Sequence, residues 1–592
     1  GILYTNIINA KEFDASSVSA SNIKIPIYDV YFALINNNVI DTGHFEYRDA
    51  GPNEKAVHEK FLVRKDQVFE TLRKELLETC TPYDNLTMEY QIYESFLAEM
   101  LYDGGIIVRS LVNTSDPTYT AWTIDETISL NEYLNYCIAQ NWIDITKLSL
   151  SGQYSDSKEI YEKIVEYIFG QIQDNVDFTK KIYRFLIKDD TVSGREVCSI
   201  LLEQDLITVP QEERAGLENG SLSAYNFMME RVRNLDITPA QLALDPHSAS
   251  MVITDVNTGD VLALVSYPGY DNNKMANGVD AEYFSQLLND LSTPMINYAT
   301  QQRTAPGSTF KMVSATAGFK EGVITPSTVF SCNAQFDKIA PPPRCWIYGR
   351  GSHGALNVTG AIRHSCNIFF YEMAYRLGTI GDTYSSDEGL AKLAAYADLY
   401  GLTETSGIEI EEATPQFSTI DAVRSAIGQG NSDFTTVGLA RYVNAVANRG
   451  TCYNLTLVDR TTDHSGNLLN ENHAVVRNTV DLSDAEWNAI HSGMRQMIEN
   501  NTHYRNFSIS VAGKTGTAEE SENRANHGLF VCYAPYETPE IAVATRIAYG
   551  YTSSYAAKTT RDVLSYYFKL EDEEDLITGT AKQMSGSTAR TD

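Results

Sequence analysis

Strand-like segments lie at both ends of the stretch 236–567, with a mostly helical region between them. Residues 249–256 and 261–267 are rich in β-branched and aliphatic side chains, and the intervening 257–260 (Asn-Thr-Gly-Asp) is a strong hairpin signal. Three more strand-like runs follow near the C-terminal end of the stretch, at 507–511, 529–533 and 541–547. We therefore expect an α+β fold in which helices flank one antiparallel sheet built from segments that are distant in sequence.

Residues 1–235 show helical periodicity and no chemical motif. Apolar side chains recur at three- and four-residue intervals in 53–80, 90–102 and 157–172, and the stretch 216–223 reads as a loop. Side chains at this spacing usually form a core. We expect 1–235 to be a mainly helical pedestal and interaction domain without catalysis of its own.

The remainder of the chain divides into a second domain, 236–567, and a tail, 568–592. Within the second domain, 361–377 and 436–447 have helical character. The tail opens with the acidic run 571–575 and continues with small polar residues, a composition that predicts a mobile segment.

A serine and a lysine three residues apart, Ser308 and Lys311, stand at the start of an alanine-rich segment that is expected to be a buried helix. At that spacing both side chains lie on one face of a helix. A serine hydroxyl is a poor nucleophile until a base takes its proton, and a neutral lysine can do so. The spacing alone is weak evidence, because Ser155 and Lys158 share it.

Two further motifs follow in order: Ser365, Cys366 and Asn367 form a Ser-x-Asn motif, and a Lys-Thr-Gly motif begins at Lys514. Ser-x-x-Lys, Ser-x-Asn and Lys-Thr-Gly together are typical of penicillin-binding proteins and class A β-lactamases. Residues 236–567 accordingly resemble the transpeptidase domain of a class B (monofunctional) penicillin-binding protein of the elongation type. Stretch 427–430 (Ile-Gly-Gln-Gly) supports the resemblance.

The resemblance implies a role for each motif residue. Ser308 would attack the penultimate D-Ala of a peptidoglycan stem peptide, and β-lactams would acylate the same hydroxyl. Lys311 would be the general base, Ser365 would relay a proton to the leaving amine, and Asn367 would hold Lys311 and the substrate backbone. The oxyanion would lie between the N–H groups of Ser308 and Thr517.

The Lys-Thr-Gly strand is implied to bind the substrate. An extended peptide would pair with this edge strand, and Gly516 would leave room for its approach. Lys514 would favour the neutral form of Lys311 through its charge. The hydroxyls of Thr515 and Thr517 would bind the terminal carboxylate of the peptide.

Three alternatives to transpeptidation remain open at this stage. A D-Ala-D-Ala carboxypeptidase differs only in passing the acyl group to water. A β-lactamase shares the motifs, but it needs an activated water and no large N-terminal domain. A non-catalytic penicillin-binding sensor or scaffold is a different class, and its relatives usually couple to a metalloprotease motif, His-Glu-x-x-His, that this sequence lacks. No glycosyltransferase signature is evident, which argues against a bifunctional class A enzyme.

The class also implies ligands, partners and location. Peptidoglycan stem peptides and β-lactams would be ligands, and cell-wall synthesis proteins would bind the N-terminal domain. The protein would act on the extracytoplasmic face of a bacterial membrane, through an N-terminal anchor that is absent from this sequence. With 46 Lys and Arg against 77 Asp and Glu, the formal charge is −31, which argues against binding nucleic acid.

A second group of chemically active residues comprises Cys332, Cys345, His353 and Cys366. Thiolate and imidazole ligands in a set of four suit tetrahedral zinc, and some elongation-type relatives carry zinc beside the active site. The alternatives are a Cys332–Cys345 disulfide or three buried thiols. Such a zinc would be structural, and no cofactor is implied for the chemistry. Residues 349–354 match the spacing of a dinucleotide fingerprint, but they follow a proline-rich loop instead of a strand, which argues against it.

Overall fold

The computed structural model describes residues 2–9, 23–148, 156–521 and 523–577. The chain forms two compact units, one running from Ile25 to Arg231 and the other from Val232 onward. The second unit also includes the first helix, α1 (Ile2–Ile7), because the Tyr4 hydroxyl donates a hydrogen bond to the carbonyl of Leu244. The predicted N-terminal domain, 1–235, includes that segment.

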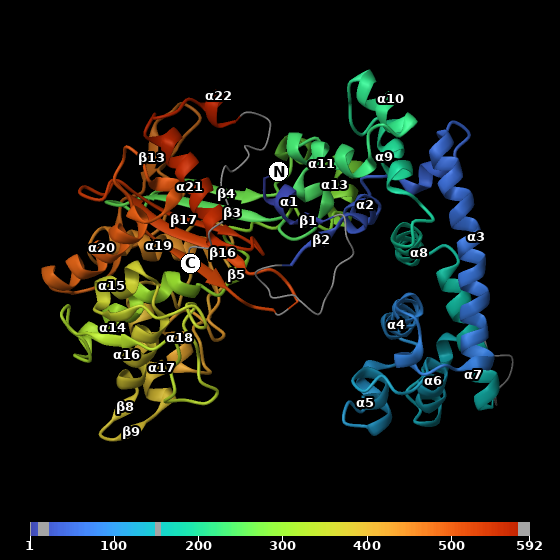
Figure 1. Ribbon diagram of the computed structural model, residues 1–592, viewed down its shortest axis with the longest axis horizontal. Coiled ribbons are helices and arrows are strands. Elements are labelled where there is room, and N and C mark those ends of the chain that lie inside the picture. Colours follow the sequence, from blue (N-terminus) through green and yellow to red (C-terminus); the bar gives the residue numbers. More distant parts are fainter. Residues whose placement is uncertain (1, 10–22, 149–155, 522, 578–592) are drawn as a thin grey trace. The chain divides into compact units, whose positions relative to one another are not determined.

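The unit that begins at Val232 is built on a five-stranded antiparallel sheet with the strand order β15-β16-β17-β3-β4. Figure 1 labels β3, β4, β16 and β17 of this sheet. Its strands are β3 (Ala249–Asp255), β4 (Val261–Tyr267), β15 (Ala512–Ala518), β16 (His527–Ala534) and β17 (Ile541–Ile547). The two ends of the unit therefore meet in one sheet, as the sequence predicts, and the α+β fold class is confirmed. β15, which carries the Lys-Thr-Gly motif, is an edge strand.

Both faces of the sheet are covered by helices. On β16, Leu529 and Val531 belong to the larger core cluster together with α19 (Thr436–Ala447), every residue of which is buried. Phe530 and Cys532 alternate with them and pack on the opposite side, in a cluster with α21 (Ser553–Tyr567). Alternation along a strand sends successive side chains to opposite faces, so each face has its own apolar layer.

The helical region between the two halves of the sheet positions the catalytic motifs. Its main helices are α14 (Lys311–Lys320), α15 (Val358–Arg363), α16 (Asn367–Leu377), α17 (Ser386–Leu399) and α20 (Asp484–Glu499). Shorter helices in the same unit are α12 (Pro239–Leu242), α13 (Ala281–Asn289), α18 (Ala422–Ser425) and α22 (Glu573–Leu576). The helical stretch expected over 361–377 is interrupted at residues 364–366, because Ser365 has a left-handed backbone with φ 52°.

Two other sequence expectations are wrong. Residues 507–511 are not a strand: Phe507 and Ile509 pack against the cluster under α21, and the strand begins only at Ala512, opposite Tyr533. Alternating burial without a strand partner produced the misleading pattern. The loop expected from 216 is helical at its start, because buried Leu217 extends α10 (Gln211–Asn219).

The Ile25–Arg231 unit is helical, as expected, and Figure 1 shows its longest helix, α3, in blue. Its helices are α2 (Ile27–Asn36), α3 (Pro52–Lys74), α4 (Met88–Asp103), α5 (Pro117–Thr123), α6 (Leu130–Ala139), α7 (Ser157–Ile172), α8 (Val176–Lys188), α9 (Gly194–Glu203), α10 and the start of α11 (Ala224–Asn234). α7 illustrates why these helices form. The Asp156 side chain caps its first turn, and Ile164, Ile168 and Ile172 form a buried apolar stripe along one face.

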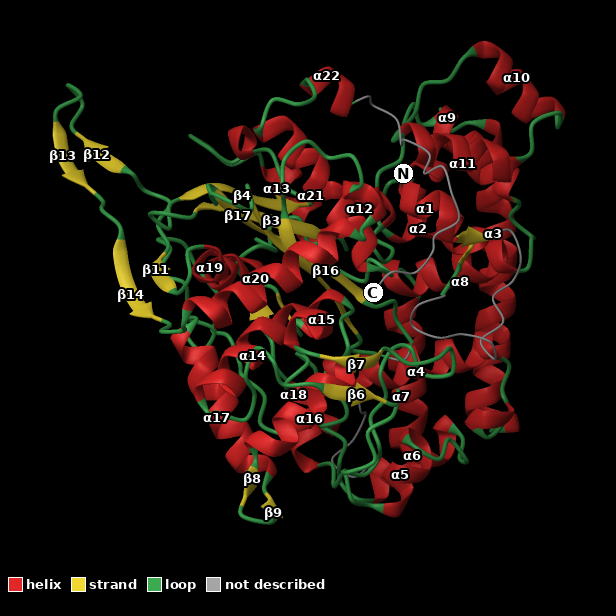
Figure 2. Cartoon of the chain, turned by 60° about the vertical axis from the view of Figure 1, so that its left-hand side comes forward, coloured by secondary structure: helices red, strands yellow, loops and turns green. Residues whose placement is uncertain are grey.

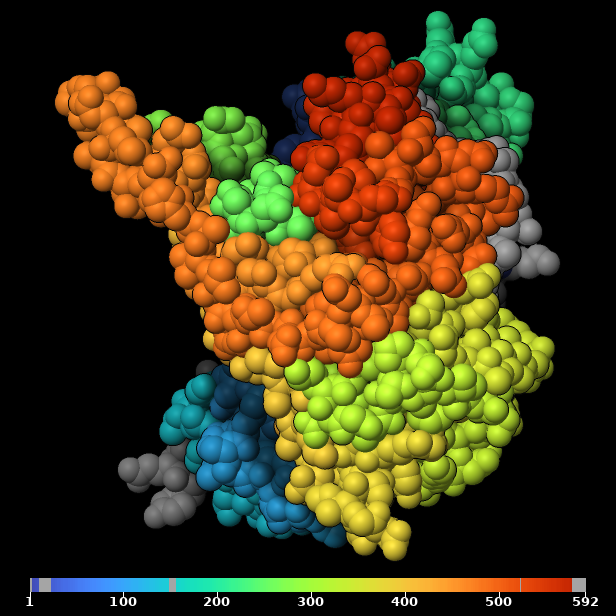
Figure 3. All heavy atoms as spheres, turned by 90° about the vertical axis from the view of Figure 1, so that its left-hand side faces the viewer, coloured from blue at the N-terminus to red at the C-terminus, as the bar shows by residue number. Residues whose placement is uncertain are grey.

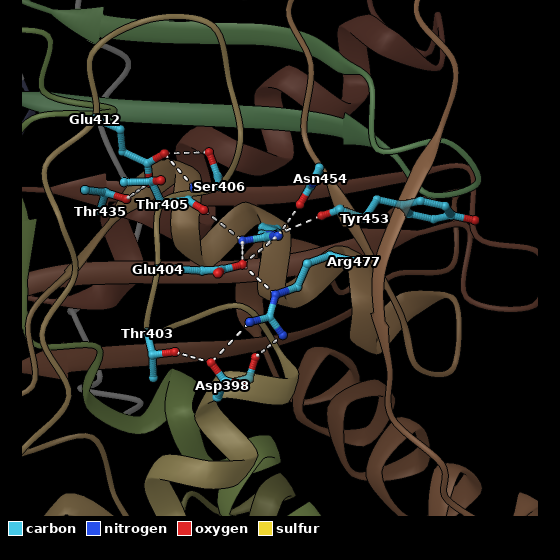
Figure 4. A network of polar contacts seen from close by, with 11 residues as sticks. Asp398, Thr403, Glu404, Thr405, Ser406, Glu412, Thr435, Tyr453, Asn454 and Arg477 are labelled. Atoms are coloured by element: carbon cyan, nitrogen blue, oxygen red, sulfur yellow. Dashed lines mark hydrogen bonds and ion pairs between the residues drawn. The ribbon is translucent and has the colours of Figure 1, made fainter.

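A β-ribbon projects from the sheet unit (Figures 2 and 3). Its strands are β11 (Thr451–Asn454), β12 (Arg460–Thr462), β13 (Leu468–Glu471) and β14 (Val475–Thr479). Two arginines fix its base. Arg477 on β14 contacts Asp398 and Glu404 (Figure 4). Buried Arg441 on α19 donates to the carbonyl of Tyr453 at 2.8 Å. These contacts attach the ribbon to the helical core.

Among the described residues, no helix combines the length and apolarity that a membrane crossing requires. The predicted tail, 568–592, is described only as far as residue 577, where it includes the short helix α22. Its remaining residues, 578–592, lie outside the described residues.

Candidate active site

Ser308 lies in a single 3-10 turn, Gly307–Phe310, that leads directly into α14. Gly307 has φ 52°, a conformation that favours glycine, and its N–H donates to the carbonyl of Gly428 at 3.0 Å. The preceding strand, β5 (Arg303–Thr304), pairs with β10 (Phe434–Thr435). The hydrogen bond to Gly428 and the pairing of β5 with β10 therefore both fix the position of the turn. The Ser308 side chain is half-buried.

Lys311 is fully buried and brings the first two motifs together. Its Nζ donates to the Ser365 carbonyl at 2.9 Å, to Ser365 Oγ at 3.0 Å and to Asn367 Oδ1 at 2.8 Å. The Ser365 hydroxyl in turn donates to Ser308 Oγ at 3.0 Å. A hydrogen-bonded line thus runs from the lysine amine through Ser365 to the Ser308 hydroxyl.

The backbone at Ser365 explains how this line forms. α15 ends at Arg363, and the left-handed residue Ser365 turns the chain so that α16 starts at Asn367. The turn aims the carbonyl and the hydroxyl of Ser365 at Lys311. A non-glycine residue in this conformation costs about 1–2 kcal/mol, so the surrounding contacts must hold it in place.

Lys514 and Thr515 lie in the edge strand β15, next to the Ser308 turn. Lys514 is fully buried, and its Nζ donates to the Thr515 carbonyl at 2.8 Å. Thr515 is buried, whereas Thr517 is partly exposed. Among the described residues β15 pairs with β16 alone, so it is an edge strand, the kind of strand to which an extended peptide can add.

Gly516 also lies against the nucleophile turn. A Cβ on this residue would lie 2.8 Å from Thr309 Cγ2 and 2.9 Å from the carbonyl oxygen of Pro306. The space that the missing side chain leaves is therefore filled by the nucleophile turn. Glycine at this position lets the Ser308 turn approach β15 closely.

The four predicted zinc ligands converge. His353 Nδ1 lies 3.5 Å from Cys332 Sγ and 3.6 Å from Cys345 Sγ, and one donor atom from each of the four residues lies within 4.8 Å of the others. Ligands at tetrahedral angles around zinc are about 3.5–3.8 Å apart, so the donor set fits this metal. All eight cysteines of the chain are described and unpaired, which contradicts a Cys332–Cys345 disulfide.

Three elements bring these ligands together. Cys332 ends β6 (Phe330–Cys332), which pairs with β7 (Gly354–Leu356) next to His353, and Cys366 caps α16. Contacts from the Cys366 thiol and then the His353 ring lower the pKa of the Cys345 thiol well below its usual value, which favours the thiolate that binds metals. Residues 349–353 lie in the connecting loop and Gly354 begins β7, so no helix opens within this stretch to receive a dinucleotide.

The sequence motifs did not reveal everything around the nucleophile. Gly428 approaches so closely that a Cβ on it would lie 2.0 Å from the carbonyl oxygen of Gly307. Its stretch, 427–430, supports the resemblance, but the sequence of that stretch does not predict this contact. Ala305 donates its N–H to the carboxylate of Glu520, a residue for which the sequence offered no signal.

Comparison with known proteins agrees with this geometry. Residues 249–565 match the family model described as the penicillin binding protein transpeptidase domain, and this range includes every predicted site residue. The peptidoglycan D,D-transpeptidase MrdA of Escherichia coli (strain K12) is 27% identical over 364 residues, which are 55% of this chain and 55% of that protein. MrdA of Haemophilus influenzae is 29% identical over 355 residues, which are 54% of this chain and 52% of that protein.

The chain thus spans about half the length of the curated relatives that it matches. Among solved structures, Pseudomonas aeruginosa PBP2 in complex with WCK 5153 is 26% identical with a TM-score of 0.46, covering 57% of this chain and 76% of that one. The family model, by contrast, covers more than half of the 592 residues and contains all three motifs. The chain therefore belongs to the penicillin-binding protein transpeptidase family.

Proposed function

We propose that this protein is a serine-type D-Ala-D-Ala transpeptidase of the elongation type, which crosslinks peptidoglycan stem peptides and is acylated by β-lactams at Ser308. The observation that carries the proposal is the hydrogen-bonded line from Lys311 through Ser365 to Ser308, beside the edge strand β15. A buried base, a relay and a half-buried hydroxyl are the groups that acyl transfer requires.

In the first step Ser308 Oγ attacks the carbonyl carbon of the penultimate D-Ala. Burial disfavours the charged form of the Lys311 amine, and a neutral amine can accept a proton. For this transfer each hydroxyl donates in the direction opposite to the one described above. Ser308 gives its proton to Ser365, and Ser365 gives its own proton to Lys311. The negative charge that develops on the carbonyl oxygen would be stabilised by the N–H groups of Ser308 and Thr517.

In the second step the C–N bond breaks and the terminal D-Ala leaves as an amine, which takes the stored proton back through Ser365. An acyl ester on Ser308 remains. The amine of a second stem peptide then attacks this ester, which forms the crosslink and returns the proton to Ser308. Throughout, Asn367 Oδ1 holds the Lys311 amine in place.

The donor peptide would bind as an extra strand along β15. Its terminal carboxylate would face the hydroxyls of Thr515 and Thr517, where the charge of Lys514 favours an anion. The part of the site formed by β15 would thus fix the register of the peptide, and the Ser308 turn would supply the reacting group.

Labelling with a fluorescent penicillin tests the proposal. Mass spectrometry should place the adduct on the peptide that contains Ser308, and Ser308→Ala should abolish it. Lys311→Met, which preserves side-chain volume, should abolish acylation in a folded protein. An adduct that survives Ser308→Ala would refute the assignment. With stem-peptide substrates, crosslinked product indicates a transpeptidase and released D-Ala alone a carboxypeptidase, whereas rapid loss of the penicillin adduct indicates a β-lactamase.

We also propose that Cys332, Cys345, His353 and Cys366 hold one structural zinc. Four protein ligands leave no open position, so this metal would contribute to folding and would not activate water. Cys366 lies between Ser365 and Asn367, and a metal bond to its sulfur would brace both catalytic neighbours. No cofactor is proposed for the chemistry.

Metal analysis should find about one zinc per chain, because one tetrahedral set is present. Cys366→Ser should lower the zinc content, the melting temperature and the acylation rate together. Cys532→Ser is the matched control, since Cys532 is equally buried but lies within β16. A zinc-free preparation with the full melting temperature would contradict the proposal.

The Ile25–Arg231 unit contains none of the motif residues. We propose that it is a pedestal and docking module for cell-wall synthesis proteins, and that the whole protein acts on the extracytoplasmic face of a bacterial membrane. In this arrangement, stem peptides and β-lactams bind the sheet unit alone.

A further inference from the structure

A polar cluster that the proposed mechanism does not use lies next to the nucleophile turn. It comprises Glu520, just past the end of β15; His527, the first residue of β16; and Arg546 on β17. His527 and Arg546 are each 1% exposed. Two polar side chains on adjacent strands and a third just past the end of β15 thus meet beside the segment that leads to Ser308.

Glu520 links two of these elements. Its Oε1 accepts a hydrogen bond from the N–H of Ala305 at 3.1 Å, and its Oε2 lies 3.0 Å from His527 Nε2. The Glu520 side chain is 35% exposed, yet both of its oxygens contact protein groups. Burial raises the pKa of this carboxyl, but the contact with His527 and the Ala305 N–H outweigh burial, so its net shift is downward and the charged form is favoured.

The tautomer of His527 follows from its second contact. The N–H of Tyr549 donates to His527 Nδ1 at 3.1 Å, so Nδ1 is an acceptor. A neutral imidazole carries one proton, which must then reside on Nε2, the nitrogen that lies against Glu520. The Tyr549 N–H therefore leaves the ring proton on the nitrogen that faces Glu520, and this nitrogen contacts the carboxylate at 3.0 Å without the angles of a hydrogen bond.

Arg546 holds the other side of the same segment. Its Nε–H donates to Thr304 Oγ1, and its Nη1 donates to Gln302 Oε1 at 3.2 Å. Burial lowers the pKa of its guanidinium to about 10, so it remains charged at neutral pH, and Glu520 is the carboxylate that opposes this shift most. Two consecutive residues, Thr304 and Ala305, are thus fixed through side chains of the sheet.

Glu520 connects the two segments that contain Ser308 and Thr517. Ala305 is three residues before Ser308, and Glu520 is three residues after Thr517. The Ala305–Glu520 bond therefore ties the two segments that carry the proposed oxyanion donors. Between them Gly307 is packed so tightly that a Cβ on it would lie 2.7 Å from the carbonyl oxygen of Thr517.

We propose that Glu520, oriented by His527, is a positioning residue that fixes the spacing between the Ser308 and Thr517 amides and so sets the rate of acylation. This inference rests on the proposed acyl transfer. A displaced oxyanion donor weakens stabilisation of the transition state more than it weakens binding of the intact β-lactam, so the effect belongs to the chemical step.

Two substitutions of His527 separate positioning from stability. His527→Gln puts an amide nitrogen where Nε2 lies, which keeps a donor for Glu520 and loses the acceptor for Tyr549. His527→Asn puts a carbonyl where Nδ1 lies, which keeps the Tyr549 bond and loses the contact with Glu520. Glu520→Ala removes the carboxylate itself. Glu519→Ala removes the same charge from the adjacent exposed residue and is the matched control.

Stopped-flow acylation by a fluorescent penicillin gives the rate constant at saturation and the dissociation constant of the initial complex. Glu520→Ala and His527→Asn should lower the rate constant about 10- to 100-fold, with the dissociation constant unchanged. His527→Gln and Glu519→Ala should acylate at nearly the wild-type rate.

The outcomes separate this inference from the proposed function. Wild-type rate constants in Glu520→Ala, or equal rate constants in His527→Asn and His527→Gln, would overturn the inference while the proposed function stands. A lower melting temperature of Glu520→Ala without a slower chemical step would also overturn it, since the residue would then be only structural. A wild-type chain that takes up no penicillin would overturn both.

Discussion

Replacing Gly307 with alanine should damage both the stability and the chemistry of the sheet unit. Gly307 has φ 52°, and a Cβ there would lie 2.7 Å from the carbonyl oxygen of Thr517, which is backbone and has no side-chain freedom to move away. The left-handed conformation costs an alanine about 1–2 kcal/mol, and overpacking adds about 1–3 kcal/mol.

Gly322 is the matched control. It follows the end of α14, the helix that the Ser308 turn begins, and it has φ 70° with no atom within 4 Å of an added Cβ. Gly322→Ala therefore carries the backbone cost without the clash. The entropy that alanine removes from the unfolded chain is common to both variants and cancels. The difference of about 1–3 kcal/mol in free energy of unfolding measures the contact with Thr517.

Calorimetry of the full chain can measure this difference. The transition of the sheet unit is the one that penicillin acylation shifts, and about 1 kcal/mol corresponds to about 2 °C in a unit of this size. Gly307→Ala should melt about 2–6 °C below Gly322→Ala. Its acylation rate should also fall at least about tenfold, because relieving the clash moves Thr517 away from Ser308.

Equal melting temperatures for the two variants, together with wild-type acylation by Gly307→Ala, would refute this reasoning. The Ser308 turn and β15 would then be further apart than the structure places them. Slow acylation with equal melting temperatures would instead show that the Ser308 turn moves without a loss of packing energy. That result would contradict the assumption that the backbones of the turn and of β15 are both rigid.

Two other residues give testable expectations. Burial lowers the pKa of His491 to about 4. Between about pH 6.5 and 4 the unfolded chain therefore binds a proton that the folded chain does not. As pH falls through this window, about 3 kcal/mol of the free energy of unfolding should be lost. Melting curves of His491→Gln, which retains a donor for the Val446 carbonyl, should lack that pH dependence. Ser365→Gly should be about 1 kcal/mol more stable than Ser365→Ala, because only alanine keeps the left-handed strain at φ 52°, and both should lose acylation equally; equal stabilities would show that the strain is absent.

Much of the sheet could be predicted from local pattern. Strands β4 and β17 occupy the predicted ranges, as do helices α7 and α19, because each buries one or two faces with a regular period that shows in the sequence. The pattern failed at 507–511, where apolar residues alternate against a core but find no neighbouring strand. Alternation of apolar residues indicates which side chains are buried, but a segment becomes a strand only when its backbone pairs with a neighbouring strand.

The sequence by itself determined which residues could carry chemistry, since Ser308, Lys311 and the two later motifs are short and ordered along the chain. Only the tertiary structure decided how they meet: Ser365 lies between Lys311 and Ser308, Gly516 clears space for the nucleophile turn, and Glu520 bonds to Ala305. These contacts join residues that are tens to hundreds of positions apart. They depend on how whole segments pack, because local propensity and spacing carry no information about which distant backbone will come within hydrogen-bond reach.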